Sequence, residues 1–176
     1  MTARKFVATL AAAEIGTTFN FYREGPGASR RRERLWRYLD EKRAARLLLV
    51  GEAPGFRGTR ISGIPFTSER QLTGTGPAEA SATVVHETLA ELELDVLCWN
   101  VVPTHPGTAS SNRRPKAAEV AAGLPFLAEL ASRRTVVAVG RLAQQVTGAP
   151  YVRHPSHGGK AAFREGLLRF RAGGGP

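Results

Sequence analysis

The chain has 176 residues, a formal net charge of +10 and a single cysteine, Cys98. This length and an apolar fraction of 42% predict one globular domain with a real core. One cysteine excludes an intramolecular disulfide and any four-cysteine iron–sulfur or zinc site, so we expect no metal and no cofactor. We also expect no leader peptide and no membrane span, because no run approaches the ~20 apolar residues that cross a bilayer. The expected location is therefore cytoplasmic.

The first part of the chain is predicted to form two helices separated by a loop. A short helix is expected over 7–15, and Ser29 is expected to cap a second helix over 30–43. Positive charge is disfavoured at a helix start by the helix dipole, yet four arginines lie there, namely Arg30, Arg31, Arg32 and Arg34. Two explanations stay open, an external anion or a solvated helix end.

The rest of the chain alternates apolar strands with helices. In chain order we predict a strand over 46–50, a loop over 51–76, a helix over 77–92, a strand over 96–102, a loop over 103–115, a helix over 116–132, a strand over 135–139, a helix over 140–147, a strand over 151–154, a helix over 160–170 and a disordered tail over 172–176. This alternation predicts an α/β fold, a three-layer α/β/α domain over residues 1–171 with a central, mainly parallel four-stranded sheet. In such a sheet the residues that follow strands meet at one edge.

The most informative segment is the glycine-rich turn that directly follows the first strand, Gly51-Glu52-Ala53-Pro54-Gly55. Glycine lets a ligand approach backbone N–H groups closely, and Glu52 is expected to project into the same cleft. The turn lacks the Gly-Lys-Ser/Thr of a phosphate-binding loop and the dinucleotide fingerprint. The alternative is an ordinary strand-ending turn with a solvated glutamate.

Two later side chains are suited to holding a planar base. Phe66 lies in a polar, glycine-containing loop, where an aromatic ring can stack on a base or, alternatively, cover a small hydrophobic cluster. Asn100 interrupts an apolar strand, and its amide can complement the imide edge of uracil or be tied to a neighbouring loop.

His154 follows the last predicted strand and precedes Pro155, which restricts its backbone. Its imidazole can donate to a carbonyl oxygen that gains charge, or it can serve as a capping or core histidine. His105 and His157 are further candidates. Metal ligation is a poor explanation, because no acidic or cysteine partner has ligand spacing.

The excess of arginine over lysine favours a polyanionic partner. The basic side chains expected around the cleft are Arg57, Arg60, Arg113, Arg114, Arg153 and Lys160, a set suited to positioning phosphates. A genome rich in G and C, which encodes many arginines, is the competing explanation for part of this excess.

Taken in chain order, these segments resemble the uracil-DNA glycosylase superfamily over about residues 46–165. The turn over 51–55 resembles the first motif of the family 4 enzymes, and His154-Pro155-Ser156 resembles the second catalytic motif. Phe66 matches the uracil-stacking phenylalanine and Asn100 the uracil-reading asparagine. Residues 112–115 and 136–142 also match in kind and spacing.

The chain also departs from the family patterns. The iron–sulfur cysteines of family 4 are missing, so the resemblance is to a branch near family 4 without the cluster. Ala53 replaces the water-activating aspartate of family 1, and Gly55 replaces the tyrosine that blocks the thymine methyl group, which leaves that slot open. Where many members place a leucine wedge, His157-Gly158-Gly159 follows the second motif.

The resemblance implies a monofunctional DNA repair enzyme that hydrolyses the bond between uracil and deoxyribose. It implies His154, Glu52 and Asn100 as catalytic residues, with residues 51–55 and Phe66 completing the uracil pocket. The DNA-binding residues that it implies, with the basic set, are Arg57, Arg113, Arg114, Arg153, Ser156, His157, Gly158 and Lys160. Uracil-containing DNA, single- or double-stranded, is the expected partner of a monomer. Three other functions stay open: a non-catalytic nucleic-acid-binding module, a glycosylase for hypoxanthine or xanthine, and a small-molecule nucleotide enzyme.

Overall fold

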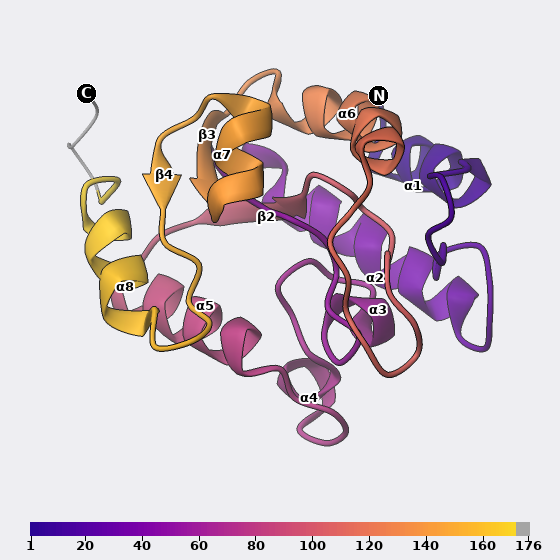
Figure 1. The fold of residues 1–176 in the computed structure, drawn as a ribbon, viewed down its shortest axis with the longest axis horizontal. Helices are drawn as coiled ribbons and strands as arrows, with labels where there is room; N and C mark the ends of the chain where they lie inside the picture. Colours follow the sequence, from indigo (N-terminus) through magenta and orange to yellow (C-terminus); the bar gives the residue numbers. More distant parts are fainter. Residues whose placement is uncertain (172–176) are drawn as a thin grey trace.

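The computed structural model describes residues 1–171. Four parallel strands form its central sheet in the order β2-β1-β3-β4, with bounds Leu47–Gly51 (β1), Val96–Asn100 (β2), Thr135–Val139 (β3) and Tyr151–Val152 (β4). The register pairs Gly51 with Asn100 at the carboxyl ends of β1 and β2. The predicted four-stranded parallel sheet is therefore confirmed, and the chain segments that follow its strands begin at one edge (Figure 1).

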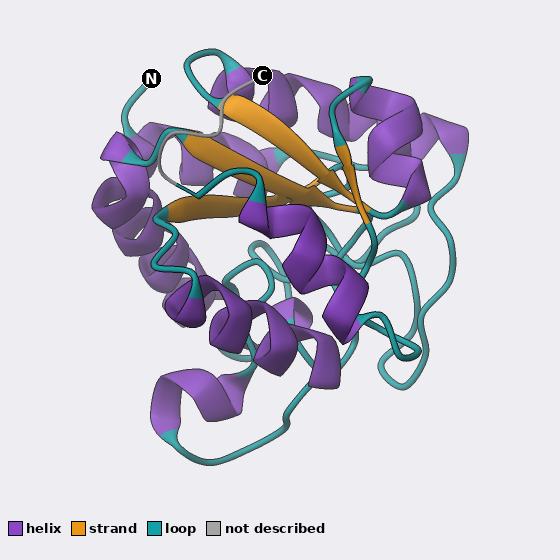
Figure 2. Ribbon diagram, turned by 90° about the vertical axis from the view of Figure 1, so that its left-hand side faces the viewer, coloured by secondary structure: helices purple, strands orange, loops and turns teal. Residues whose placement is uncertain are grey.

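Helices cover both faces of the sheet, as Figure 2 shows. In the described residues they are α1 (Ala3–Ala12), α2 (Ala28–Glu41), α3 (Thr59–Ser62), α4 (Glu69–Thr73), α5 (Ala80–Glu91), α6 (Ala117–Ala131), α7 (Arg141–Thr147) and α8 (Lys160–Leu168), with a 3₁₀ turn at Lys42–Ala44. Side chains alternate along β1, so Leu48 and Val50 pack with α1, α2, α6 and α7, while Leu49 packs with α5 and α8. These two buried clusters make the predicted three-layer α/β/α arrangement. None of the helices in residues 1–171 is long and apolar enough to span a membrane.

Several predicted boundaries are wrong, and local hydrogen bonds explain two of them. The first helix runs over Ala3–Ala12 and not 7–15, because the Thr2 side chain accepts from the Lys5 N–H at its start and the Asn20 amide donates to the Leu10 carbonyl oxygen at its end. Ser29 is not the cap of α2, since the N-cap is Gly27, which takes the left-handed conformation. These are contacts that hydrophobic periodicity does not report.

The other differences concern short or frayed elements. The predicted loop over 51–76 contains α3 and α4, and α4 is stabilised by a capping box between Ser68 and Gln71. The helix predicted over 77–92 begins only at Ala80, the second and fourth strands end at Asn100 and Val152, and the last helix ends at Leu168. The tail predicted over 172–176 lies outside the described residues.

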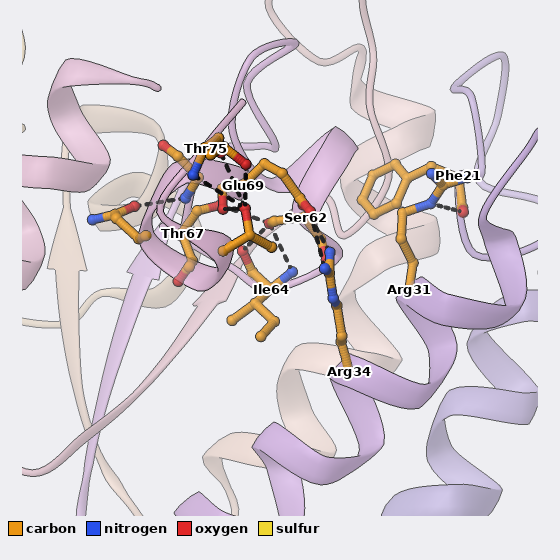
Figure 3. A network of polar contacts seen from close by, with 11 residues as sticks. Phe21, Arg31, Arg34, Ser62, Ile64, Thr67, Glu69 and Thr75 are labelled. Atoms are coloured by element: carbon orange, nitrogen blue, oxygen red, sulfur yellow. Dashed lines mark hydrogen bonds and ion pairs between the residues drawn. The ribbon is translucent and has the colours of Figure 1, made fainter. Parts of the chain in front are cut away.

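The arginines at the start of α2 hold neighbouring loops in place. Arg31 Nε donates to the Phe21 carbonyl oxygen (2.5 Å), and Arg32 donates to that of Tyr22 (2.6 Å). Arg34 donates to the Ser62 carbonyl oxygen and forms a two-pronged ion pair with Glu69, at 2.7 and 2.9 Å (Figure 3). These intramolecular acceptors explain the unfavourable helix position of three of the four arginines, without an external anion.

Candidate functional site

A cleft of about 310 Å³ opens at the carboxyl edge of the sheet. The predicted base-binding residues that line it are Glu52, Ala53, Pro54, Gly55, Phe66, Asn100 and His154. They come from the turn after β1, the last residue of β2, the segment after β4 and the loop between α3 and α4. The structure thus brings residues that are about 100 positions apart in the chain into one pocket of a size that suits a small planar ligand.

Gly51 lets an aromatic ring and an amide close over the end of β1. A Cβ atom at this position would lie 2.8 Å from Asn100 Oδ1 and 3.0 Å from Phe66 Cε2, closer than side chains tolerate. Phe66 itself has a φ of 53°, which is uncommon for a residue other than glycine. Its ring also packs against the second hydrophobic core, so it is both a wall of the cleft and part of a small apolar cluster.

Asn100 is buried, with 4% of its surface exposed. Its side-chain amide makes no hydrogen bond with any residue in the described part of the chain, so the alternative of an amide tied to a loop is not observed. The amide reaches the cleft surface, since Trp99 Nε1 is the one side-chain polar atom in residues 1–171 that is both fully buried and unpaired. The amide is consequently available to a ligand in the cleft.

The contacts of His154 fix which of its ring nitrogens can donate. The backbone N–H of Ser156 donates to His154 Nδ1 (3.2 Å), and the Ser156 hydroxyl lies 2.8 Å from the same nitrogen. Because Nδ1 accepts, the neutral imidazole carries its proton on Nε2. Burial, helped by nearby His157, lowers the pKa of His154 and favours that neutral form. Nε2 has no partner within residues 1–171, which leaves its N–H free to donate.

Glu52 is half-buried in the same cleft. Burial raises the pKa of its carboxyl, and the positive charge of Arg114 opposes the shift. The carboxyl accepts no hydrogen bond from the described residues. It is therefore more than the solvated glutamate of an ordinary turn, and it can receive a hydrogen bond from a ligand or a water.

Two contacts hold the turn over 51–55 against the loop over 103–115. The ring of buried His105 places Nδ1 2.8 Å from the Pro54 carbonyl oxygen and Nε2 2.8 Å from that of Thr108. The Phe56 N–H donates to Asn112 Oδ1 (2.9 Å). His105 is thus committed to backbone carbonyls, and it acts as a support for the turn rather than as a ligand-facing group.

The predicted DNA-binding side chains differ in whether they pair with other side chains of the protein or are exposed to solvent. Arg113 lies at the cleft, but its guanidinium holds the buried carboxylate of Glu119, at 2.5 and 2.8 Å. Lys160 pairs with Glu87 on α5 at 2.8 Å. Arg57, Arg114 and Arg153 are exposed. Their contact with DNA stays a prediction.

The second-motif residues continue from the cleft to the surface. Ser156 lines the cleft, whereas His157 and Gly158 form an exposed turn with positive φ values. The carbonyl oxygen of His157 accepts from Arg153 at 3.3 Å. Arg60 lies at 5.4 Å over the ring of Phe19 and is absent from the cleft.

Sequence reasoning missed cleft residues that follow no strand, above all Glu79 and Ser81 at the start of α5. A single glutamate before a helix reads as a solvated charge. The sequence signal that could have indicated Glu79 is the pair of glycines Gly55 and Gly58, which leave room for a side chain from elsewhere. The Glu79 carboxyl carbon would lie 2.7 and 3.1 Å from Cβ atoms at these two positions. The slot expected beside Gly55 is therefore not open: the Glu79 carboxyl fills it.

Comparisons with known proteins agree with this geometry. A family model described as the Uracil DNA glycosylase superfamily matches residues 38–168. Among solved structures, the chain is similar to the crystal structure of wild-type SMUG2 from Pedobacter heparinus, with a TM-score of 0.67 and 15% sequence identity over 97% of each chain. At that identity the likeness concerns the fold. Comparison with curated proteins gave no match.

Proposed function

The chain belongs to the uracil DNA glycosylase superfamily, and we propose that it hydrolyses the N-glycosidic bond of deoxyuridine in DNA, releasing uracil and leaving an abasic site. Membership makes it a DNA-binding glycosylase of base excision repair. The finer assignment to uracil rests on one observation: Phe66, Asn100 and His154 share a cleft in which the Asn100 amide and His154 Nε2 have no protein partner in the described chain.

The proposed reaction begins with the target nucleotide outside the stack, at a cost of a few kcal/mol. Phe66 stacks on the everted base, which is worth roughly 1–3 kcal/mol, and the Asn100 amide pairs with the N3 and O4 edge of uracil. This leaves O2 directed toward His154. Such a pose gives the Asn100 amide and His154 Nε2 one partner each.

Charge development then explains the role of the imidazole. As the bond between C1′ and N1 breaks, its electron pair passes to the base and increases the negative charge on O2, which the His154 Nε2–H stabilises. The sugar becomes positively charged, so a weakly activated water adds its hydroxyl to C1′ and its proton ends on the released uracil. We assign Glu52 to orienting this water, a role that tolerates Ala53 in place of an aspartate.

The test is base release from oligonucleotides that carry one uracil, hypoxanthine or xanthine, single- and double-stranded, at one salt concentration. We expect release of uracil. Asn100→Ala should slow it roughly 10–100-fold, since a buried hydrogen bond is worth about 1–3 kcal/mol. Gln145→Ala, which removes an exposed amide on α7, is the control and should not change the rate.

Other outcomes would assign a different function. Release of a purine alone moves the specificity to that base, and release from free deoxyuridine without dependence on DNA indicates a small-molecule enzyme. Tight oligonucleotide binding with no base released identifies a non-catalytic module. A full uracil rate in Asn100→Ala contradicts the role given to the amide.

A further inference from the structure

Glu79 is a partly buried carboxyl in the cleft, and the proposed reaction gives it no role. It lies directly before α5, where its backbone N–H donates to Ser68 Oγ (2.8 Å) and its carbonyl oxygen accepts from the Thr83 N–H (3.2 Å). Both ends of its peptide unit are thus tied to neighbouring structure. The backbone of Glu79 holds its side chain toward the cleft.

The carboxyl group occupies space that two glycines leave empty. Its carbon would lie 2.7 Å from a Cβ at Gly55 and 3.1 Å from one at Gly58, and one carboxyl oxygen would lie closer still to each. No described residue donates a hydrogen bond to it, and burial raises the pKa of the carboxyl. A partly buried carboxyl without a cation or donor adds little to stability, so its place in a ligand cleft points to a role in the site.

The proposed pose, on which this inference rests, says which edge of the base meets Glu79. A pyrimidine has three in-plane edges besides the bond to the sugar. With O2 at His154 and the N3 and O4 edge at Asn100, the remaining C5 and C6 edge faces the third side of the cleft. We assign that side to Gly55 and Glu79, because both line the same cleft, the Glu79 carboxyl lies against Gly55, and the pose gives them no other contact with the base.

We propose that Glu79 is a specificity-determining residue, whose carboxyl fills the side of the cleft next to C5 and excludes pyrimidines with a substituent there, such as thymine. Gly55 has no side chain with which to do this. A methyl group on C5 would have to displace the Glu79 carboxyl from between the two glycines. Discrimination by one methyl group in a pocket is typically about 10–200-fold.

The test compares wild type with Glu79→Ala, which empties the space, and Glu79→Gln, which keeps it filled without the charge. Single-turnover excision is measured on matched single-stranded oligonucleotides that carry uracil or thymine. Binding of free uracil and free thymine is measured in parallel by NMR titration. Glu33→Ala, which removes an exposed carboxylate on α2, is the control, and melting curves verify that every variant is folded.

We expect wild type, Glu79→Gln and Glu33→Ala to prefer uracil by at least about 10-fold in both assays. Glu79→Ala should accept thymine to within about threefold of uracil. An unchanged preference in Glu79→Ala overturns the proposal, and so does a Glu79→Gln protein that accepts thymine freely. If wild type excises no uracil, the proposed reaction fails by itself, and the binding of the two free bases still decides the role of Glu79.

Discussion

The arginines of α2 and the polar side chains of the cleft differ in whether the chain itself supplies their hydrogen-bond partners. Arg31, Arg32 and Arg34 each donate to acceptors of the chain itself. Asn100 and His154 Nε2, although more buried than an arginine usually is, have no such partner in residues 1–171. Polar groups that are satisfied internally stabilise loops, whereas polar groups that reach the cleft without a protein partner are available to a ligand.

This comparison predicts that substitutions in the cleft mainly lower the rate of base release, whereas substitutions at the α2 arginines mainly lower the free energy of unfolding. The largest effect is expected for His154→Ala. Loss of one donor to a developing anion typically costs roughly 10²–10³ in rate, whereas loss of the contacts between Ser156 and His154 Nδ1 should cost only about 1 kcal/mol of stability. Gln145→Ala, at an exposed amide on α7, is the control and should change neither the rate nor the melting temperature. A large stability loss in His154→Ala would place the imidazole with the structural groups.

The pair between Arg113 and Glu119 is the strongest internal ion pair near the cleft. The Arg113 guanidinium and other donors lower the pKa of the Glu119 carboxyl to about 2 from a usual 4.5. Because this pKa is lowered by folding, the stabilisation is complete above about pH 5 and is lost as the pH falls toward 2.

Glu119→Gln should therefore lose on the order of 3 kcal/mol at pH 7 and show a flatter acid dependence. Urea unfolding of both proteins across the acid range measures this difference. Equal loss at pH 7 and at pH 2 would contradict the charge-based explanation.

Arg34→Ala should remove about 2 kcal/mol of stability, the usual worth of hydrogen bonds between charged groups. It should leave base release unchanged at a temperature where the protein is folded, because Arg34 acts on the loop at Ser62 and Glu69 (Figure 3). A double-mutant cycle with Glu69→Gln isolates the pair. A rate loss with no stability loss would show that α2 contributes to the site.

The smallest effect is expected for Arg114→Ala. Arg114 is exposed and acts on Glu52 through charge alone, so its expected role is contact with phosphate. Removing it should weaken binding to undamaged DNA a few-fold and lower the salt dependence by about one unit of slope. Arg37→Ala, an exposed arginine on α2, should do neither. An unchanged salt slope in Arg114→Ala would remove Arg114 from the DNA interface.

The sequence was sufficient for the sheet because its strands are continuous apolar runs, such as Leu47–Val50, separated by helix-length segments. It also placed Asn100 and His154 together, because in a parallel sheet the strand ends share an edge, whereas Phe66 was recognised only as an aromatic ring in a polar loop. It could not locate α3 and α4, which at four and five residues are too short to show a helical period.

The partners of individual side chains could not be predicted either. The ion pairs of Arg34 with Glu69 and of Arg113 with Glu119 depend on how the loops fold, and no local sequence pattern reports them. The proposed role of Glu79 depends on its carboxyl lying beside Gly55. That proximity depends on the tertiary structure and cannot be read from the order of the residues. Periodicity reports which face of an element is buried, but not which polar atom meets which.

The space beside Gly55 is filled by the residue that precedes α5, and not by the turn with the sequence Gly-Glu-Ala-Pro-Gly. Two proteins can therefore share that pentapeptide and still differ in the shape of the pocket at this point. Classification by the pentapeptide alone would group them together. The amino acid that precedes α5 is the position to compare when such proteins are sorted by substrate.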